Sequence, residues 1–255
     1  MVGFSFDRRI ARAGELAQKH AAVSQLLRFY QELVRFQKSV CASLASVEDH
    51  SVASLLPHVS GLLSVVRRIG SPVLAQTAQE LADFSSEEWL DLLSGGWQPE
   101  EQDQELPLEI AFFTHALLQP QAEYLAGRTS SPTESSPPLC PFCNSKPQVG
   151  VLRPEGDGAK RSLICSLCST EWNFRRVVCP GCGEENKDRL PVFIASEFDY
   201  VRVEACDTCH TYIKSIDLSK NGHAVPVVDE LATVSLNLWA QENKYSKLSP
   251  NLFGV

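Results

Sequence analysis

Apolar residues between positions 5 and 126 recur at steps of three and four, the spacing that places side chains on one face of an α-helix. The clearest run covers residues 23–44. Its apolar positions share one stripe: Val23, Leu26, Leu27, Tyr30, Leu33, Val34, Val40, Cys41 and Leu44. We therefore expect the first half of the chain to be helical and Cys41 to lie buried in its core.

Two later helices in this half carry local signals. Ser85 and Glu88 have the spacing of a capping box, and Gly95-Gly96 is expected to end the helix that follows. Residues 105–126 form another helical run, in which Pro120 predicts a kink.

The pattern changes abruptly at residues 128–138, RTSSPTESSPP, a polar stretch typical of a flexible linker. Beyond it, short runs rich in β-branched residues predict strands at RSLIC (161–165), RRVVC (175–179) and YVRVEAC (200–206). Pro226 opens a predicted last helix over residues 226–245. One face of that helix carries Val227, Leu231, Val234 and Leu238. That face needs a partner surface, most simply the cysteine-rich segment.

These patterns predict an α+β fold: a helical N-terminal domain, two consecutive rubredoxin-like or zinc-ribbon-like four-cysteine modules and a C-terminal helix. The expected boundaries are 1–127 for the helical domain, 128–138 for the linker, 139–177 and 178–218 for the two modules, and 219–255 for the last helix and tail.

Charge and composition limit the classes of function that the chain can have. The chain has a net charge of -8 and a pI near 5.3, so a nucleic-acid backbone would on average be repelled. No run approaches the roughly 20 uninterrupted apolar residues of a membrane span, and we expect a cytoplasmic protein. In that reducing compartment, nine cysteines indicate metal binding rather than disulfides.

Eight of the nine cysteines form four Cys-x-x-Cys pairs, and two such pairs complete one tetrahedral four-thiolate site. An internal repeat selects among the three ways to combine them, because the first pairs of the two units start 39 residues apart and the second pairs 41 apart. The repeat predicts one site from Cys140, Cys143, Cys165 and Cys168, and a second from Cys179, Cys182, Cys206 and Cys209.

Residues beside the cysteines agree with metal-binding turns. Asn144, Gly183 and His210 each follow the second cysteine of a pair, and these residue types tolerate a positive φ. Trp172 and Tyr212 follow the second pair of each unit, where a small metal module needs a large ring for its core. Four sulfur ligands suit zinc and rubredoxin-type iron equally, so we expect two metal ions of either kind.

A closed four-thiolate shell leaves no position for a reacting water, so a structural metal is expected and redox work is the alternative. No phosphate-binding loop or nucleophile motif appears, and we expect no enzyme activity and no catalytic residue. Basic residues of the first module form either solvated strand edges or a docking patch for an acidic partner or nucleic acid. They are Arg153, Lys160, Arg161, Arg175 and Arg176.

At CPFCNSKPQVGVLR, SLICSLCSTEWNFRRVVCPGCGEEN and EACDTCHTYIKSIDL the chain closely resembles the FdhE family, the formate dehydrogenase accessory proteins. The resemblance continues through VVDELATVSLNLWAQENKY to SPNLFGV, about residues 139–255. It implies a non-enzymatic cytoplasmic factor that acts on the formate dehydrogenase catalytic subunit before export. It also implies a helical N-terminal domain and two rubredoxin-like modules, with iron as a metal of the family and all eight paired cysteines as ligands.

Our interpretation is an accessory protein whose metal modules present the surface around Trp172, Arg175 and Arg176 to the catalytic subunit. It predicts no nucleic-acid or membrane partner and allows a homodimer. The alternatives are a zinc-ribbon nucleic-acid-binding protein and a rubredoxin-like electron carrier.

Overall fold

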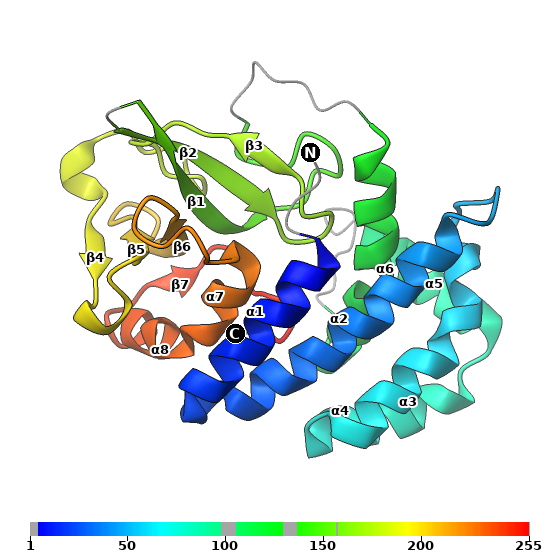
Figure 1. The fold of residues 1–255 in the computed structure, drawn as a ribbon. Helices are drawn as coiled ribbons and strands as arrows, with labels where there is room; N and C mark the ends of the chain where they lie inside the picture. The colour runs from blue at the N-terminus through cyan, green and yellow to red at the C-terminus, as the bar shows by residue number, and fades with distance from the viewer. Residues whose placement is uncertain (1–4, 98–105, 130–136, 157, 255) are drawn as a thin grey trace.

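The structure, a computed structural model, describes residues 5–97, 106–129, 137–156 and 158–254. Figure 1 shows the helices of the first half beside a twisted sheet, with the two C-terminal helices along the lower side of the sheet in this view. The mixed α+β class is therefore confirmed. The N-terminal helices are α1 (Phe6–Lys19), α2 (Ser24–Leu44), α3 (Val59–Ile69), α4 (Pro72–Glu80), α5 (Ser86–Trp97) and α6 (Leu108–Gly127), with short 3₁₀ turns at Ala21–Val23, Val52–His58 and Leu81–Asp83.

The capping box of α5 forms as predicted. The Ser85 backbone N–H donates to the Glu88 carboxylate at 2.7 Å, and the Glu88 N–H donates to Ser85 Oγ at 3.2 Å. Gly95-Gly96, however, does not end this helix, which continues to Trp97. A Cβ on Gly96 would lie 2.3 Å from Thr114 Cγ2, so this glycine permits close packing of α5 on α6.

The helical core follows the predicted stripe of α2. Its centre, Leu27, Leu33, Val34 and Val40, is fully buried, but Cys41 lies at the edge of the stripe and is only half-buried. Pro120 lies buried inside α6, which runs on to Gly127. Of the described residues, only Val52–Ile69 form a helical stretch long and apolar enough, by length and composition alone, to cross a membrane.

The described residues of the second half form one seven-stranded sheet in the order β3-β2-β1-β6-β5-β4, with β7 beside β6. Two antiparallel three-stranded units, β1-β2-β3 and β4-β5-β6, are joined where β1 and β6 run parallel. The predicted strands at 161–165 and 200–206 are confirmed within β2 and β5. The strands are β1 (Pro147–Glu155), β2 (Gly158–Cys165), β3 (Glu171–Asn173), β4 (Val192–Ile194), β5 (Val201–Ala205), β6 (Thr211–Asp217) and β7 (Ser246–Lys247).

The strand predicted at residues 175–179 is wrong, because this segment is a turn between the two units. Its carbonyl groups are bound by a side chain instead of a neighbouring strand. The Arg161 guanidinium donates to the carbonyl oxygens of Arg175 at 3.0 Å and Val178 at 3.3 Å. The β-branched Val177, which favoured a strand, is 49% exposed.

The predicted last helix is two helices, α7 (Pro226–Ala232) and α8 (Val234–Glu242), separated at Thr233. The break follows from Lys214 of β6, a fully buried cation that pairs with the Glu230 carboxylate at 2.9 Å. Its ammonium also donates to the carbonyl oxygens of Glu230 at 2.5 Å and Thr233 at 3.2 Å. The single apolar face predicted for residues 226–245 is therefore wrong, and Leu238 is 58% exposed.

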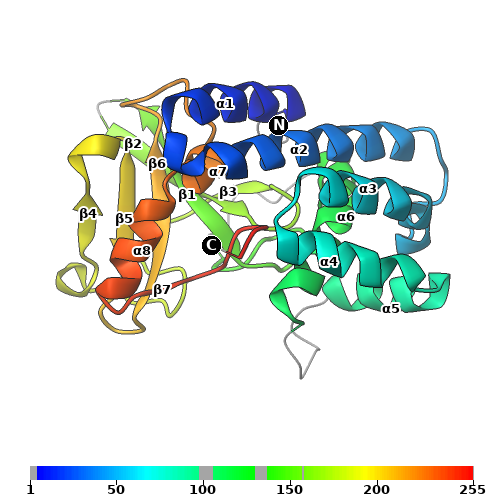
Figure 2. The same ribbon diagram turned by 90° about the horizontal axis from the view of Figure 1, so that it is seen from below.

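Helix α7 packs on β1 and β6, the partner surface expected from the sequence, and also on α1. Figure 2 shows α1 and α2 lying across α7. A buried ion pair joins them: Arg12 of α1 donates to the Asp229 carboxylate at 2.5 and 3.0 Å. The Tyr200 hydroxyl donates to the same carboxylate at 2.9 Å. The helical half is thus bonded to the cysteine-rich half through buried charge.

The predicted linker, 128–138, lies mostly outside the described residues, and the domain boundaries given above stay a prediction. Helices and sheet nevertheless share one apolar core. It contains Phe113 and Leu117 of α6 together with Leu163, Trp172 and Ile213 from the sheet.

The parallel joint of β1 and β6 provides a test of this topology. A Cβ on Gly150 would lie 2.2 Å from Oγ of Ser215, its register partner, and that buried hydroxyl has no hydrogen-bond partner among the described residues. Gly150→Ala should lower the free energy of unfolding by about 1–3 kcal/mol through overpacking. Ser215→Ala alone should be nearly neutral, and Gly150→Ala/Ser215→Ala should recover part of the loss. Chemical denaturation of the unmodified chain and the three variants measures these free energies of unfolding. If the effects of the two substitutions simply add, the close contact between Gly150 and Ser215 at the parallel pairing of β1 and β6 would be contradicted.

Candidate metal centres

The structure gathers the eight paired cysteines into two groups: Cys140, Cys143, Cys165 and Cys168 (site 1), and Cys179, Cys182, Cys206 and Cys209 (site 2). Within each group all four sulfurs lie within 4.8 Å of one another. These are the two groups that the repeat predicts. That the cysteines hold metal remains a prediction, so we tested the fit of the donor sets.

The sulfur–sulfur distances suit a tetrahedral ion. Site 1 has Cys143–Cys165 at 3.3 Å and Cys140–Cys168 at 3.5 Å. Site 2 has Cys179–Cys209 and Cys182–Cys206, both at 3.7 Å. A metal–sulfur bond of about 2.3 Å gives tetrahedral edges of about 3.8 Å. Both groups can therefore hold one ion each with little movement.

All four Cys-x-x-Cys turns share one backbone design. The N–H of each first cysteine donates to the carbonyl oxygen five residues later, from Cys140 to Ser145, Cys165 to Thr170, Cys179 to Glu184 and Cys206 to Thr211, at 2.9–3.0 Å. The residue after each second cysteine has positive φ, at 62° for Asn144, 54° for Ser169, 78° for Gly183 and 55° for His210. The predicted positive φ is confirmed at Asn144, Gly183 and His210. Ser169 was missed because serine is not typical of this conformation, although its place in the repeat marks it.

Polar hydrogens point at several sulfurs, as a thiolate site requires. Cys165 Sγ accepts from the backbone N–H of Leu167 at 3.3 Å and of Cys168 at 3.4 Å, and Cys179 Sγ accepts from Gly181 at 3.3 Å. The two units repeat a hydroxyl contact: Thr170 Oγ1 lies 3.1 Å from Cys168 Sγ, and Thr211 Oγ1 lies 3.1 Å from Cys209 Sγ.

In the absence of a metal ion, the thiols of the two sites have different pKa values. Hydrogen bonding with its three neighbours, Cys140 foremost, raises the pKa of Cys165, and burial raises the pKa of Cys179. Burial also opposes ionisation of Cys209, but hydrogen bonds with Thr211, Cys182 and Cys179 together outweigh it and lower the pKa of that thiol to about 7. Four thiolates at these distances need a cation among them, which a bound metal ion supplies.

The two sites differ in their surroundings. In site 1, Cys140, Cys165 and Cys168 are buried within the core shared with the helices. Trp172 lies in the same core, buried as predicted, with its indole N–H donating to the Pro137 carbonyl oxygen at 2.9 Å. In site 2, Cys182 is exposed and Cys209 half-buried.

A buried polar network ties site 1 to the helices. Glu123 of α6 pairs with Arg9 of α1 at 2.8 Å and accepts from the Ser169 hydroxyl at 2.7 Å. The side chain of Gln119, also on α6, donates to the Ser166 carbonyl oxygen at 3.0 Å. Sequence reasoning missed this network because its members lie up to 160 residues apart and follow no motif.

The predicted basic patch around Trp172 is only partly a surface feature, since Arg175 and Arg176 are exposed. Trp172 is buried, and Arg161 is buried in an ion pair with Glu204 at 2.6 Å that joins β2 of one unit to β5 of the other. Arg175 pairs with Glu185 at 2.6 Å. Two of the other three basic residues also form ion pairs, Arg153–Glu171 at 2.7 Å and Lys160–Glu155 at 4.0 Å. The third, Arg176, donates to the Ala159 carbonyl oxygen at 3.3 Å.

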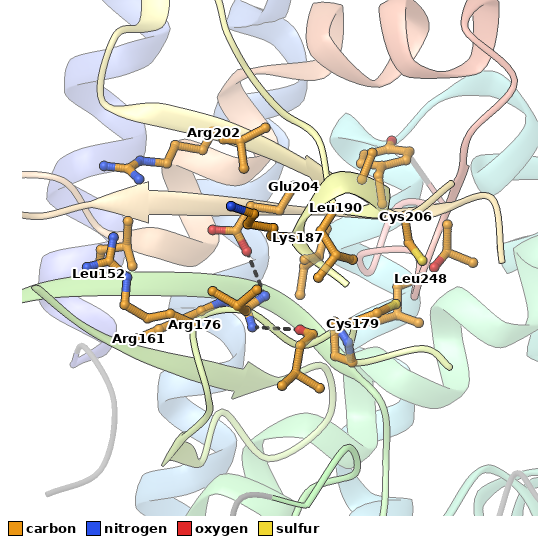
Figure 3. A pocket seen from close by; sticks show the side chains of 18 residues that line it. Leu152, Arg161, Arg176, Cys179, Lys187, Leu190, Arg202, Glu204, Cys206 and Leu248 are labelled. Atoms are coloured by element: carbon orange, nitrogen blue, oxygen red, sulfur yellow. Dashed lines mark hydrogen bonds and ion pairs between the residues drawn. The ribbon is translucent and has the colours of Figure 1, made fainter. Parts of the chain in front are cut away.

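A cavity of about 220 Å³ lies beside site 2, between the two units. Figure 3 shows Arg161 and Glu204 pointing toward each other across it, with Cys179 and Cys206 at one end and Arg202 and Leu152 at the other.

Comparisons with known proteins agree on one family. The sequence profile described as "FdhE, central domain" matches residues 139–176, and that described as "FdhE, C-terminal domain" matches residues 177–253. A protein named "Protein FdhE homolog" from Aquifex aeolicus is 31% identical over 264 residues, which cover 94% of this chain and 92% of that protein. The Pseudomonas aeruginosa homolog is 36% identical over 122 residues, 45% of this chain but only 38% of that protein.

The fold is likewise similar to a solved structure. The crystal structure of the FdhE protein from Pseudomonas aeruginosa matches with a TM-score of 0.77 and 25% identity. The match covers 98% of this chain and 95% of that chain, so the helical half is included.

Metal analysis of a single-cysteine variant tests the grouping. Cys168→Ser removes one sulfur from site 1 and should lower the metal content from two ions per chain to one, because site 2 keeps all four of its thiolates. Elemental analysis of the purified protein measures the ratio. Cys41→Ser, which changes the ninth cysteine, should keep both ions. Loss of both ions from Cys168→Ser, with the fold retained, would contradict two separate sites.

Proposed function

Since the chain belongs to the FdhE family, we propose that it binds the catalytic subunit of formate dehydrogenase in the cytoplasm and supports assembly or activation of that enzyme. The family makes it a formate dehydrogenase-related accessory protein. The observation that carries the finer proposal is the pair of four-thiolate groups, set in a fold that matches an FdhE protein over nearly the whole chain.

The donor sets support binding rather than catalysis. When all eight cysteines ligate, each ion has four protein ligands, and no position remains for substrate or water. We propose iron or zinc as the metal. In either case the ions hold short strands and turns in place, and iron would add one-electron chemistry.

The thiols also support the cytoplasmic location. All nine cysteines, each within the described residues, are free. In an oxidising compartment, sulfurs 3.3–3.7 Å apart would be prone to form disulfides, whereas a reducing one keeps them available for metal.

The nucleic-acid alternative loses support from the ion pairs. Three of the five basic residues that the sequence offered for phosphate contacts are engaged by Glu171, Glu185 and Glu204. A net charge of -8 also opposes binding to a phosphate backbone.

An affinity pull-down tests the proposed partner. Tagged full-length protein from formate-grown cells should retain the formate dehydrogenase catalytic subunit, and metal analysis of the same sample should find two ions per chain. Cys168→Ser should retain less of the subunit because site 1 supports the shared core. Recovery of ribosomal or nucleic-acid components without any formate dehydrogenase subunit would contradict the proposal.

A further inference from the structure

Strand β4 forms an open edge of the sheet, since it pairs only with β5 in the described part of the chain. The Ala205 N–H donates to the Pro191 carbonyl oxygen at 3.0 Å, so the pair Pro191/Ala205 is hydrogen-bonded. Bonded and non-bonded pairs alternate along an antiparallel ladder, which makes Phe193/Val203 the next bonded pair. The N–H and C=O groups of Val192 and Ile194 therefore point away from the sheet.

The same two residues expose apolar side chains. Val192 is 52% and Ile194 49% exposed, whereas Phe193 between them packs on Trp239 with ring centroids 4.7 Å apart. Val177, 49% exposed, lines the 220 Å³ cavity together with Val192. An edge strand with apolar side chains and no charge of its own is a template for pairing with another strand.

In the first unit of the internal repeat, the equivalent edge is paired with a further strand. In the first unit, β1 has the place that β4 has in the second, as the strand that follows the first cysteine pair. The outer edge of β1 is occupied by β6 in parallel register, from Gly150/Ser215 to Leu152/Asp217. The equivalent edge of β4 has no such occupant among the described residues.

Charge around the cavity specifies the occupant. Its lining includes the cations Arg176, Lys187 and Arg202. Glu204 is the single carboxylate among the described lining residues, and it is paired with Arg161. Asp217 pairs with Arg202 at 2.7 Å, whereas no carboxylate of a described residue pairs with Arg176 or Lys187. Arg176 and Lys187 are therefore two cations beside the open strand with which carboxylates of a partner can pair.

We propose that the β4 edge and the adjoining cavity bind an extended acidic segment of a partner protein, which adds a strand beside Val192 and Ile194 while its carboxylates meet Arg176 and Lys187. The partner is the one proposed above, so this inference rests on the proposed function. A second copy of the chain fits less well, because pairing two β4 edges about a two-fold axis would bring like charges together.

Binding of purified, metal-loaded full-length protein to the catalytic subunit tests the surface. Val192→Asp/Ile194→Asp places two negative charges on the open strand and should weaken binding by about tenfold or more. Val47→Asp/Val73→Asp adds the same charge at exposed apolar residues of the helical half, 43% and 58% exposed, and should bind like the unmodified chain. Metal content and the melting temperature confirm that both variants fold.

Hydrogen exchange of the unmodified chain supplies a second readout. The backbone amides of Val192 and Ile194 should exchange at least tenfold more slowly when the subunit is bound. Equal binding by both variants and unprotected amides would overturn the docking surface while leaving the proposed function standing. Absence of binding by the unmodified chain would overturn both. Dimerisation of the chain that Val192→Asp/Ile194→Asp abolishes would assign the edge to a second copy and overturn the acidic occupant.

Discussion

The mutual repulsion of four thiolates in site 1 is the constraint on which the rest of the structure depends. Three of these cysteines are buried in the core that the helices and the sheet share, where charge is costly unless it is neutralised. A metal ion lowers that cost by offsetting part of the negative charge, and it fixes two turns of the chain at once. The residue after Cys168 then adopts φ 54° and offers its hydroxyl to Glu123, which also binds Arg9. The metal site and the packing of two helices are therefore parts of one arrangement.

Site 2 has the same ligands and turns but a different setting. Its Cys182 is exposed, and it adjoins the cavity and the open strand β4 rather than the helical core. The repeat thus gives one site that faces inward and one that faces the surface. In this account, site 1 holds the two halves of the protein together, and site 2 holds the strand edge to which a partner segment binds.

Local chemistry made much of this arrangement predictable. The Cys-x-x-Cys spacing, the repeat, three of the four positions that follow a second cysteine and the Ser85–Glu88 cap are all short-range signals, and the structure contains each of them. Side chains that bind residues distant in the sequence explain the features that the sequence did not predict. Arg161 binds carbonyl groups that a strand would have used, and Lys214 divides the last helix by binding carbonyl oxygens at its break. The Arg9–Glu123–Ser169 network likewise joins residues that no sequence window contains together.

Hydrogen exchange on two matched cysteine variants tests the central role of site 1 most directly. Cys168→Ser disrupts the inward site, and Cys206→Ser disrupts the outward one. The account predicts that Cys168→Ser speeds exchange of the backbone amides in α1 and α6, whereas Cys206→Ser speeds exchange in β4 and β5 and leaves those helices protected. Unchanged protection of α1 and α6 in Cys168→Ser, with its site 1 metal lost, would contradict the account.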